Sequence, residues 1–362
     1  MWTIILFLAI LSFLVFVHEA GHFFVAKKMG MAVEEFGFGF PPRAWSVKRG
    51  GTTYSVNWIP LGGFVRLKGE NGEERRAPDS FASKPVWRRF LVLVAGVAMN
   101  FLAAAVVLSA SLMIGAPSAL SGGALPAGAS VRDAQLQIET VVAGSPADKA
   151  GIRPGDALVS LGGQAIAGEE AARAYIQAHP DGVTAVVRAA SGSVRTLTLV
   201  PAPLPAAGRA RAVGVGLLAT GIVSLPFGPA VAQGFAGAAG MVRDVVLGLI
   251  GLIRQLIVQH QVSAELSGPV GIAVMTGDVA KLGVLYVLPF VAVLSANLAV
   301  INALPFPALD GGRILFLAME KLRGKPADER VEALVHNIGF LVLLALILLV
   351  TVHDFLHLGV KT

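Results

Sequence analysis

A single apolar segment at the start of the chain carries three ionisable side chains. Residues 1–26 are mostly Leu, Ile, Phe and Val, and a run of this length can cross a bilayer as one helix. Within it lie His18, Glu19 and His22. Ionisable groups inside a membrane-spanning helix are costly and usually belong to a functional site. This segment therefore predicts a membrane protein with a polar site at membrane depth.

The spacing of these three residues is that of a zinc site. His18 and His22 are four residues apart, so on a helix both imidazoles project from the same face. With Glu19 they form the pattern H-E-x-x-H, which places two zinc ligands next to a general base. The carboxylate can accept a proton from the attacking water. Two buried histidines with an unrelated glutamate are the alternative, and the position within an apolar segment favours the metal site.

The whole chain has the composition of a membrane protein. Of its 362 residues, 55% are hydrophobic and 14% are charged, whereas about a quarter of the residues in soluble proteins are charged. The net charge of +6 comes from basic residues beside the apolar segments, which indicates membrane orientation and not nucleic-acid binding. The absence of cysteine excludes disulfides and cysteine-ligated zinc.

The apolar segments predict a mainly α-helical membrane protein with four membrane-spanning helices. These cover residues 1–27, 87–116, 284–312 and 334–357. Basic residues are concentrated in 28–86 and 313–333, which places both loops on the cytoplasmic side. Residues 204–283 are expected to be a linker. The charges in its stretch 241–258 favour an amphipathic helix that lies on the membrane.

The loop after the first helix is expected to hold a small β-sheet. Short apolar runs alternate with glycine and proline over residues 33–68, a pattern that predicts hairpins. Its phenylalanines and Trp58 would enter the membrane surface; an ordinary soluble β-subdomain is the alternative. An exposed edge strand here could pair with an extended substrate, which a protease needs because helical peptide bonds are shielded.

The composition changes to that of a soluble domain between residues 126 and 203. Residues 138–142 and 157–161 are predicted strands, with a capped short helix at 145–150. The run at 144–158, G-S-P-A-D-K-A-G-I-R-P-G-D-A-L, resembles bacterial PDZ domains, which bind extended peptide ends by strand addition. The resemblance implies one inserted PDZ-like α+β domain on the extracytoplasmic side. It either binds a peptide end or caps the site and limits substrate size.

A third metal ligand is expected after the third span. Residues 302–312 read N-A-L-P-F-P-A-L-D-G-G, and the two prolines stop a regular helix there. The basic residues that follow place Asp310 on the same membrane side as His18 and His22. A catalytic zinc site has three protein ligands plus water, so this carboxylate fits as the third. An aspartate that only forms a turn is the alternative.

Two other polar patterns in apolar segments have simpler interpretations. Asn100 lies in the second span, where we expect an ordinary interhelical hydrogen bonder. His353 and His357 repeat the four-residue spacing with an acid between them, but they lie at the outer end of the last span. That end is about a membrane thickness from Asp310. We interpret this pair as interfacial polar residues, with weak adventitious metal binding as the lesser alternative.

Together these patterns resemble the site-2 protease family of intramembrane zinc metalloproteases, in its RseP-like branch. The sequence H-E-A-G-H at 18–22 matches the family's zinc-binding helix, and residues 302–311 match its N-x-x-P-x-P-x-L-D-G motif. The family's membrane-reentrant β-hairpin corresponds to residues 37–67, and residues 267–271 resemble a further family segment. The chain has one PDZ-like domain, whereas some enterobacterial relatives have two.

The resemblance implies a complete catalytic site. The ligands of Zn2+ would be His18, His22 and Asp310. Glu19 would be the general base. Asn297 and Asn302 would contact or orient the substrate backbone, unless these two are packing amides.

The implied activity is regulated intramembrane proteolysis by a multi-pass protein of the inner membrane, with its active site near the cytoplasmic side. Substrates would be single-span membrane proteins whose outer portion is already trimmed, such as an anti-sigma factor, or signal-peptide remnants. A membrane scaffold with an inactive metal site and a metal transporter are readings from other classes. However, no catalytic residue is missing, and a transporter needs neither Glu19 nor a peptide-binding domain. A prenyl-protein protease would need a glutamate ligand in place of Asp310.

Overall fold

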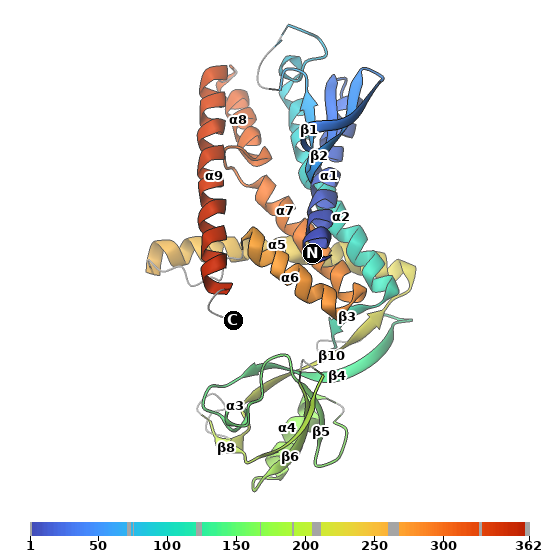
Figure 1. Ribbon diagram of the computed structural model, residues 1–362, viewed down its shortest axis with the longest axis vertical. Coiled ribbons are helices and arrows are strands. Elements are labelled where there is room, and N and C mark those ends of the chain that lie inside the picture. Colours follow the sequence, from blue (N-terminus) through green and yellow to red (C-terminus); the bar gives the residue numbers. More distant parts are fainter. Residues whose placement is uncertain are drawn as a thin grey trace. The chain divides into compact units, whose positions relative to one another are not determined.

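The chain folds into two compact units (Figure 1). The computed structural model describes residues 2–70, 74, 76–120, 125–166, 168–189, 192–204, 211–259, 268–325 and 328–358. The helical unit comprises Met1–Ser111 and Val231–Thr362, and the sheet unit comprises Leu112–Ala230. The predicted insertion of a soluble unit between apolar helices therefore corresponds to a separate set of contacts.

The helical unit is built from α-helices, most of them long and apolar. They are α1 (Trp2–Lys28), α2 (Val86–Ile114), α5 (Phe227–Gln259), α6 (Pro269–Leu282), α7 (Val284–Ala303), α8 (Asp310–Arg323) and α9 (Glu329–Leu358), with a 3-10 turn at Phe81–Ser83. Five of these described helices are long and apolar enough to cross a membrane, by length and composition: α1, α2, α5, α7 and α9. The sequence predicted four spans.

The additional candidate span is α5. The sequence predicted an amphipathic helix over 241–258 within a linker of residues 204–283, but the structure has one helix of 33 residues from Phe227 to Gln259. Its charges are too few to interrupt the apolar stretch, and large apolar side chains such as Leu247 and Ile257 are exposed along it. The helix predicted over 241–258 is therefore present but begins earlier, at Phe227, and its placement on the membrane surface stays a prediction.

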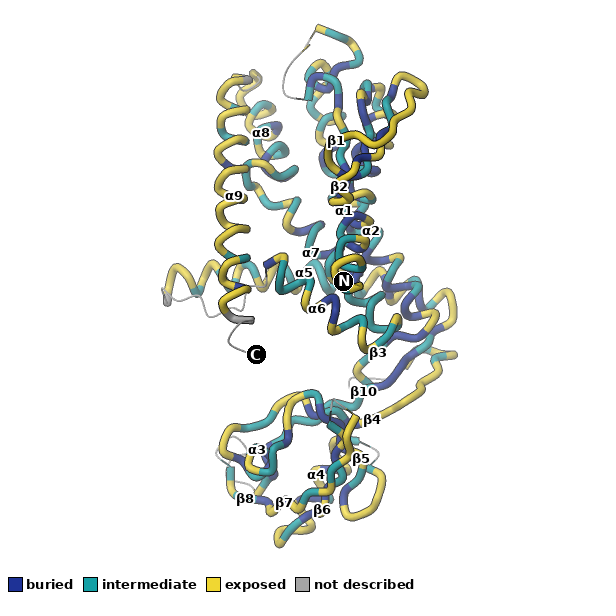
Figure 2. The backbone as a smooth tube through the Cα atoms, in the orientation of Figure 1, coloured by how far each residue is buried: buried dark blue, intermediate teal, exposed yellow. Residues whose placement is uncertain are grey.

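The predicted span at 284–312 is divided. Helix α7 ends at Ala303 and α8 begins at Asp310, because Pro305 and Pro307 lack the backbone N–H groups that a continuous helix needs. The break brings Asp310 to the first turn of a new helix. Helix α9 is exposed along most of its length (Figure 2), and its last turns contact α6 through Asp354.

Strands β1 (Val33–Arg49) and β2 (Thr52–Leu67) form the sheet predicted after the first helix. Both strands are bent, so the first part of β1 lies between the two ends of β2: Phe36 pairs with Tyr54 on one side and with Val65 on the other. Residues 63–67 consequently pair with β1 on one side, and their other side faces α1. This small sheet therefore has an edge next to the helix that carries the histidines.

An apolar cluster holds this sheet against the helices. Its buried members come from α1, the connection after it, the sheet, the 3-10 turn, α2 and α8: Phe23, Ala26, Met31, Val33, Leu67, Phe81, Val92, Leu93 and Leu317. Burial of these side chains removes apolar surface from water where the loops leave the membrane helices. The cluster fixes α1, α2 and α8 relative to one another.

The sheet unit is an antiparallel sheet with two short helices. Its strands are β3 (Ala116–Ala119), β4 (Ser130–Val141), β5 (Ala157–Leu161), β6 (Val183–Arg188), β7 (Val194–Leu199) and β10 (Val215–Ser224), in the order β3-β10-β4-β5-β6-β7. Helices α3 (Pro146–Lys149) and α4 (Glu169–Ala178) cover it, and β8 (Ala202–Pro203) pairs with β9 (Arg211–Ala212). Its buried core includes Ile138, Ile152 and Leu161.

Strand β10 corrects the predicted boundary of this unit. The sequence assigned residues 204–283 to a linker, yet β10 lies within the sheet and pairs with β3 on one side and β4 on the other. The predicted strand at 157–161 and the short helix after Ser145 are confirmed; the Ser145 hydroxyl accepts a hydrogen bond from Asp148 N–H at 3.3 Å and caps α3.

Candidate metal centre

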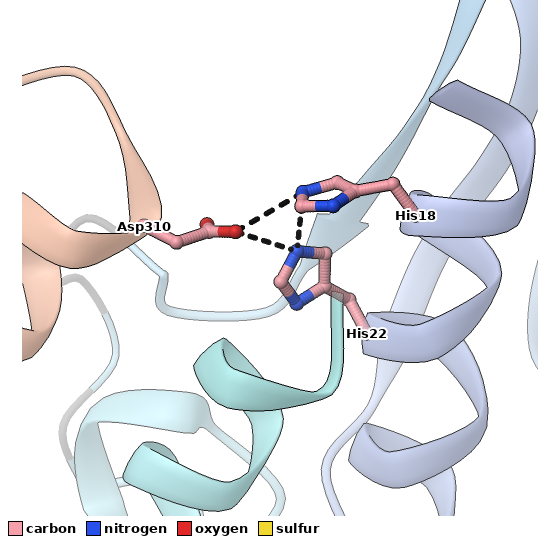
Figure 3. A group of neighbouring side chains, drawn as sticks. All are labelled: His18, His22 and Asp310. Atoms are coloured by element: carbon pink, nitrogen blue, oxygen red, sulfur yellow. Dashed lines mark hydrogen bonds and ion pairs between the residues drawn. The ribbon is translucent and has the colours of Figure 1, made fainter. Parts of the chain in front are cut away.

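Three side chains from two distant parts of the chain meet at one point (Figure 3). The Nε2 atom of His18 lies 3.0 Å from Oδ2 of Asp310, and the Nε2 atom of His22 lies 3.2 Å from the same oxygen. The two Nε2 atoms are 3.1 Å apart. The one-turn spacing of the histidines on α1 and the interruption of the helix before α8 together create this triangle of possible ligand atoms.

The triangle has the dimensions of a zinc site. Ligands at about 2.0–2.1 Å from a tetrahedral zinc ion are about 3.3 Å from one another, close to the distances between these three atoms. Among the described residues, Oδ2 of Asp310 is buried and faces no donor apart from the two imidazole Nε2 atoms, which is the state expected of an oxygen that serves as a metal ligand. His18 and His22 are both buried. These three residues could therefore hold zinc.

Helix α2 packs directly behind the histidines because two glycines allow it. A Cβ on Gly21 of α1 would overlap the carbonyl oxygen of Ala95 and lie 2.7 Å from Cγ of Met99. A Cβ on Gly96 of α2 would overlap Nε2 of His22. Small residues at a membrane helix interface permit this close approach. The imidazoles are consequently confined between α2 and Asp310.

The backbone around Asp310 is held by close contacts. Ala308 has a left-handed backbone with φ of 78°, which is uncommon for a residue with a side chain, and its N–H donates a 3.0 Å hydrogen bond to Nδ1 of His336 on α9. A Cβ on Gly311 would overlap the carbonyl oxygen of Leu304, and one on Gly312 would overlap that of Phe306. The two glycines after Asp310 thus permit α8 to start against the end of α7.

Two ion pairs fix α8 to the rest of the helical unit. Arg313 on α8 binds Glu70, which follows β2, and Glu320 on α8 binds Arg89 on α2. All four side chains are at least two-thirds buried, so solvent screens these pairs less than ordinary surface pairs. The carboxylate of Asp310 is therefore positioned from both ends of its helix.

Glu19 faces the sheet edge. Its Oε2 atom accepts a 3.0 Å hydrogen bond from the backbone N–H of Val65 in β2. Its carboxylate is not part of the triangle of ligand atoms but is close enough to interact electrostatically with all three residues. An acid–base group is thus placed between the candidate metal centre and a strand edge.

The two asparagines predicted to contact substrate lie on α7. Asn297 donates a 2.9 Å hydrogen bond from Nδ2 to the Val293 carbonyl of its own helix, and Asn302 is half-buried in the last turn. Among the described hydrogen bonds, none joins either of them to the histidines or to Asp310. Their substrate-binding role stays a prediction.

Sequence reasoning missed a contact of Asn100. We expected an ordinary helix-packing amide, but its Nδ2 lies 3.3 Å from Nδ1 of His18. The available signal was Gly96, one helical turn earlier on the same face, since a small residue and an amide together indicate close helix packing. That pattern by itself does not identify the partner.

The interpretation of the second histidine pair as interfacial stays a prediction, because the pair is only partly described. The side chain of His357 lies outside the described residues, as does Ser267 in the segment 267–271. Asp354, between the two histidines, is buried and accepts hydrogen bonds from Gly268 N–H at 3.2 Å and Gly271 N–H at 2.8 Å. This carboxylate caps the start of α6.

Comparison with known proteins identifies the family. The family model "Peptidase family M50" matches residues 6–346. The chain is 32% identical to a putative zinc metalloprotease of Rhizobium meliloti, over 97% of this chain and 94% of the relative. It is 30% identical to the zinc metalloprotease RasP of Geobacillus kaustophilus, over 97% of each. It is 28% identical to the regulator of sigma-E protease RseP of Escherichia coli, over 98% of each. The chain therefore belongs to peptidase family M50, the site-2 protease family.

Proposed function

We propose that this multi-pass inner-membrane protein is an intramembrane zinc endopeptidase that cleaves single-span membrane proteins, with His18, His22 and Asp310 as metal ligands and Glu19 as general base. The observation that carries the proposal is the convergence of Nε2, Nε2 and Oδ2 at 3.0–3.2 Å. The two histidines lie on α1, a helix apolar enough to span a membrane, and Asp310 lies at the start of α8, just after a second such helix, α7. Zinc agrees with the donor set and with the names of the relatives.

The chemistry divides between the metal and the chain. Zinc bound by His18, His22 and Asp310 would supply a Lewis acid and would lower the pKa of the attacking water. Glu19 accepts the proton of the attacking water and delivers it to the leaving amine, because it sits one residue from a ligand. Burial of the histidines and the packing of α2 behind them exclude other water from the ligands.

The edge of β2 is suited to presenting a peptide bond to Glu19. A substrate helix must unwind before hydrolysis, because its peptide bonds are otherwise hydrogen-bonded within the helix. An extended segment that pairs with residues 63–67 would satisfy its freed backbone groups by strand addition. The hydrogen bond from Val65 N–H to Glu19 joins this edge to the proposed base, and an arriving strand would compete for it.

The substrate class follows from the relatives and from the membrane placement of the site. The Escherichia coli relative is named a regulator of sigma-E protease, so a pre-trimmed anti-sigma factor is the proposed substrate, with signal-peptide remnants as a second class. Lys27 and Lys28 end α1 and support a site near the cytoplasmic side. On this topology the sheet unit is extracytoplasmic.

The sheet unit offers a groove for a peptide end, as a PDZ-like domain would. A cavity of about 450 Å³ lies between α4 and β10, and its lining includes Ile176, Val215 and Leu217 with the backbone of Gly214. Apolar side chains beside a strand edge suit an extended peptide. Arg211 at the same cavity adds a positive charge that complements a terminal carboxylate.

Glu19→Gln and Asp310→Ala separate the two proposed roles. The purified protein is reconstituted with a tagged single-span substrate, and cleavage and bound zinc are measured together. We expect Glu19→Gln to abolish cleavage with zinc retained, and Asp310→Ala to weaken zinc binding as well. Asp278→Ala, an exposed acid on α6, is the matched control and should behave like wild type. Cleavage that survives Glu19→Gln would overturn the assignment of this site.

A further inference from the structure

Helix α2 orients one of the two histidines through a backbone carbonyl. The ring atom Nδ1 of His22 lies 2.8 Å from the Val92 carbonyl oxygen, which can only accept, so Nδ1 carries the ring proton. The lone pair of His22 is then on Nε2, the atom that faces Asp310. A hydrogen bond of this kind sets the tautomer of a metal-binding histidine and the direction of its ring.

The corresponding position behind His18 is occupied by Asn100, two helical turns after Val92. Nδ2 of Asn100 lies 3.3 Å from Nδ1 of His18, and the asparagine is completely buried. In this orientation an amide N–H faces Nδ1, which leaves the ring proton of His18 on Nε2. The other amide atom of Asn100, Oδ1, is buried without a hydrogen-bond partner. In this orientation the amide donor of Asn100 faces the ring, and its acceptor Oδ1 has no donor.

We propose that Asn100 is the positioning residue of His18: its amide turns by 180° and presents Oδ1 to the Nδ1–H group of the imidazole. The turn exchanges Nδ2 and Oδ1 within the same volume, so no neighbour has to move. It gives the orphaned oxygen a donor. It also moves the ring proton to Nδ1 and frees the lone pair of Nε2 toward Asp310. The inference rests on the proposed metal role of His18.

The side chain and the backbone of Asn100 make different contacts, so the two can be tested separately. Its main-chain carbonyl accepts a 2.8 Å hydrogen bond from the Ser295 hydroxyl on α7, and Ser295 is completely buried. The contact between α2 and α7 therefore uses the backbone of residue 100, whereas the side chain points to α1. Substitution of the amide and removal of the Ser295 hydroxyl test these two contacts one at a time.

The experiment measures zinc affinity by chelator competition on the full-length protein in detergent, together with the thermal midpoint after zinc removal. Asn100→Leu keeps the volume and removes the acceptor, and we expect it to weaken zinc binding roughly 10- to 100-fold. Asn100→Asp restores an acceptor at the same place and should stay within about threefold of wild type. Ser295→Ala should lower the zinc-free midpoint and leave zinc affinity unchanged.

Wild-type zinc affinity in Asn100→Leu would overturn the inference, as would an equal loss in Asn100→Asp. If Asn100→Leu does not fold, Asn100→Ala replaces it, because the smaller side chain also removes the acceptor without crowding α1. The same loss of zinc affinity is expected of Asn100→Ala, and wild-type affinity would again overturn the inference. Failure of the proposed function is distinguishable, since in that case the wild-type protein itself would not bind zinc at this site.

Discussion

The substitution Gly96→Ala tests whether α2 confines the two imidazoles. The added methyl group would overlap Nε2 of His22 and lie 2.6 Å from its Cε1 and 2.7 Å from Cε1 of His18. Ordinary van der Waals contact begins near 3.4 Å. The ring of His18 therefore has to move by about 0.7 Å and that of His22 by more, whereas a metal–ligand distance tolerates a deviation of about 0.2 Å.

The expected magnitude is large for a single methyl group. A displacement of this size at a reacting centre costs roughly 100-fold in rate, so we expect cleavage to fall by about that factor or more and zinc affinity to fall with it. Overpacking also destabilises a core by about 1–3 kcal/mol. This opposes the gain of about 1 kcal/mol that alanine brings to a helix in place of glycine.

The assay compares Gly96→Ala with a matched glycine substitution elsewhere in the membrane helices. Gly248 lies within α5, and a Cβ there meets nothing within 4 Å, so Gly248→Ala should leave zinc affinity and cleavage unchanged. Bound zinc is counted in each purified variant, and cleavage of a tagged single-span substrate is followed in liposomes. Wild-type zinc content and cleavage in Gly96→Ala would refute the argument that α2 sets the position of the imidazoles.

Three further outcomes are expected. Asp354→Ala leaves the N–H groups of Gly268 and Gly271 unpaired and should destabilise the protein by about 1–3 kcal/mol in thermal unfolding, with zinc content unchanged; zinc loss would contradict a purely structural role. Ile138→Ala, in the core of the sheet unit, should cost about 2–5 kcal/mol, seen as faster proteolysis of that unit within the full chain, and unaltered proteolysis would count against its buried position. Zinc removal with a chelator should abolish cleavage until zinc is restored, and cleavage by the stripped protein would exclude metal catalysis.

The sequence predicted the parts of the site that depend on local geometry. A spacing of four residues brings His18 and His22 to one face of any helix, so their proximity did not depend on the rest of the fold. Asp310 required a further argument, from the helix break at Pro305 and Pro307 and from the membrane side given by the basic residues. The structure brings all three together at 3.0–3.2 Å.

The pairing of strands that are distant in the sequence was harder to predict. Strand β10 was assigned to a linker because its apolar and glycine-rich sequence does not show which strand it pairs with, and its partners β3 and β4 lie far back in the chain. The length of α5 was underestimated because three charges in 241–258 outweighed the apolar residues around them. Local patterns specify a helix or a strand, whereas partners follow from packing that no window of sequence contains.

The sequence by itself determined the membrane class, the zinc-binding pattern and the family resemblance, since hydropathy and short spacings act through local geometry. Only the tertiary structure decided what surrounds the site: Gly96 against the imidazoles, Asn100 beside His18, and the β2 edge beside Glu19. These contacts join segments that are distant along the chain. They arise because close packing of helices leaves room for a glycine or for one amide at each place, and the sequence does not state which surfaces meet.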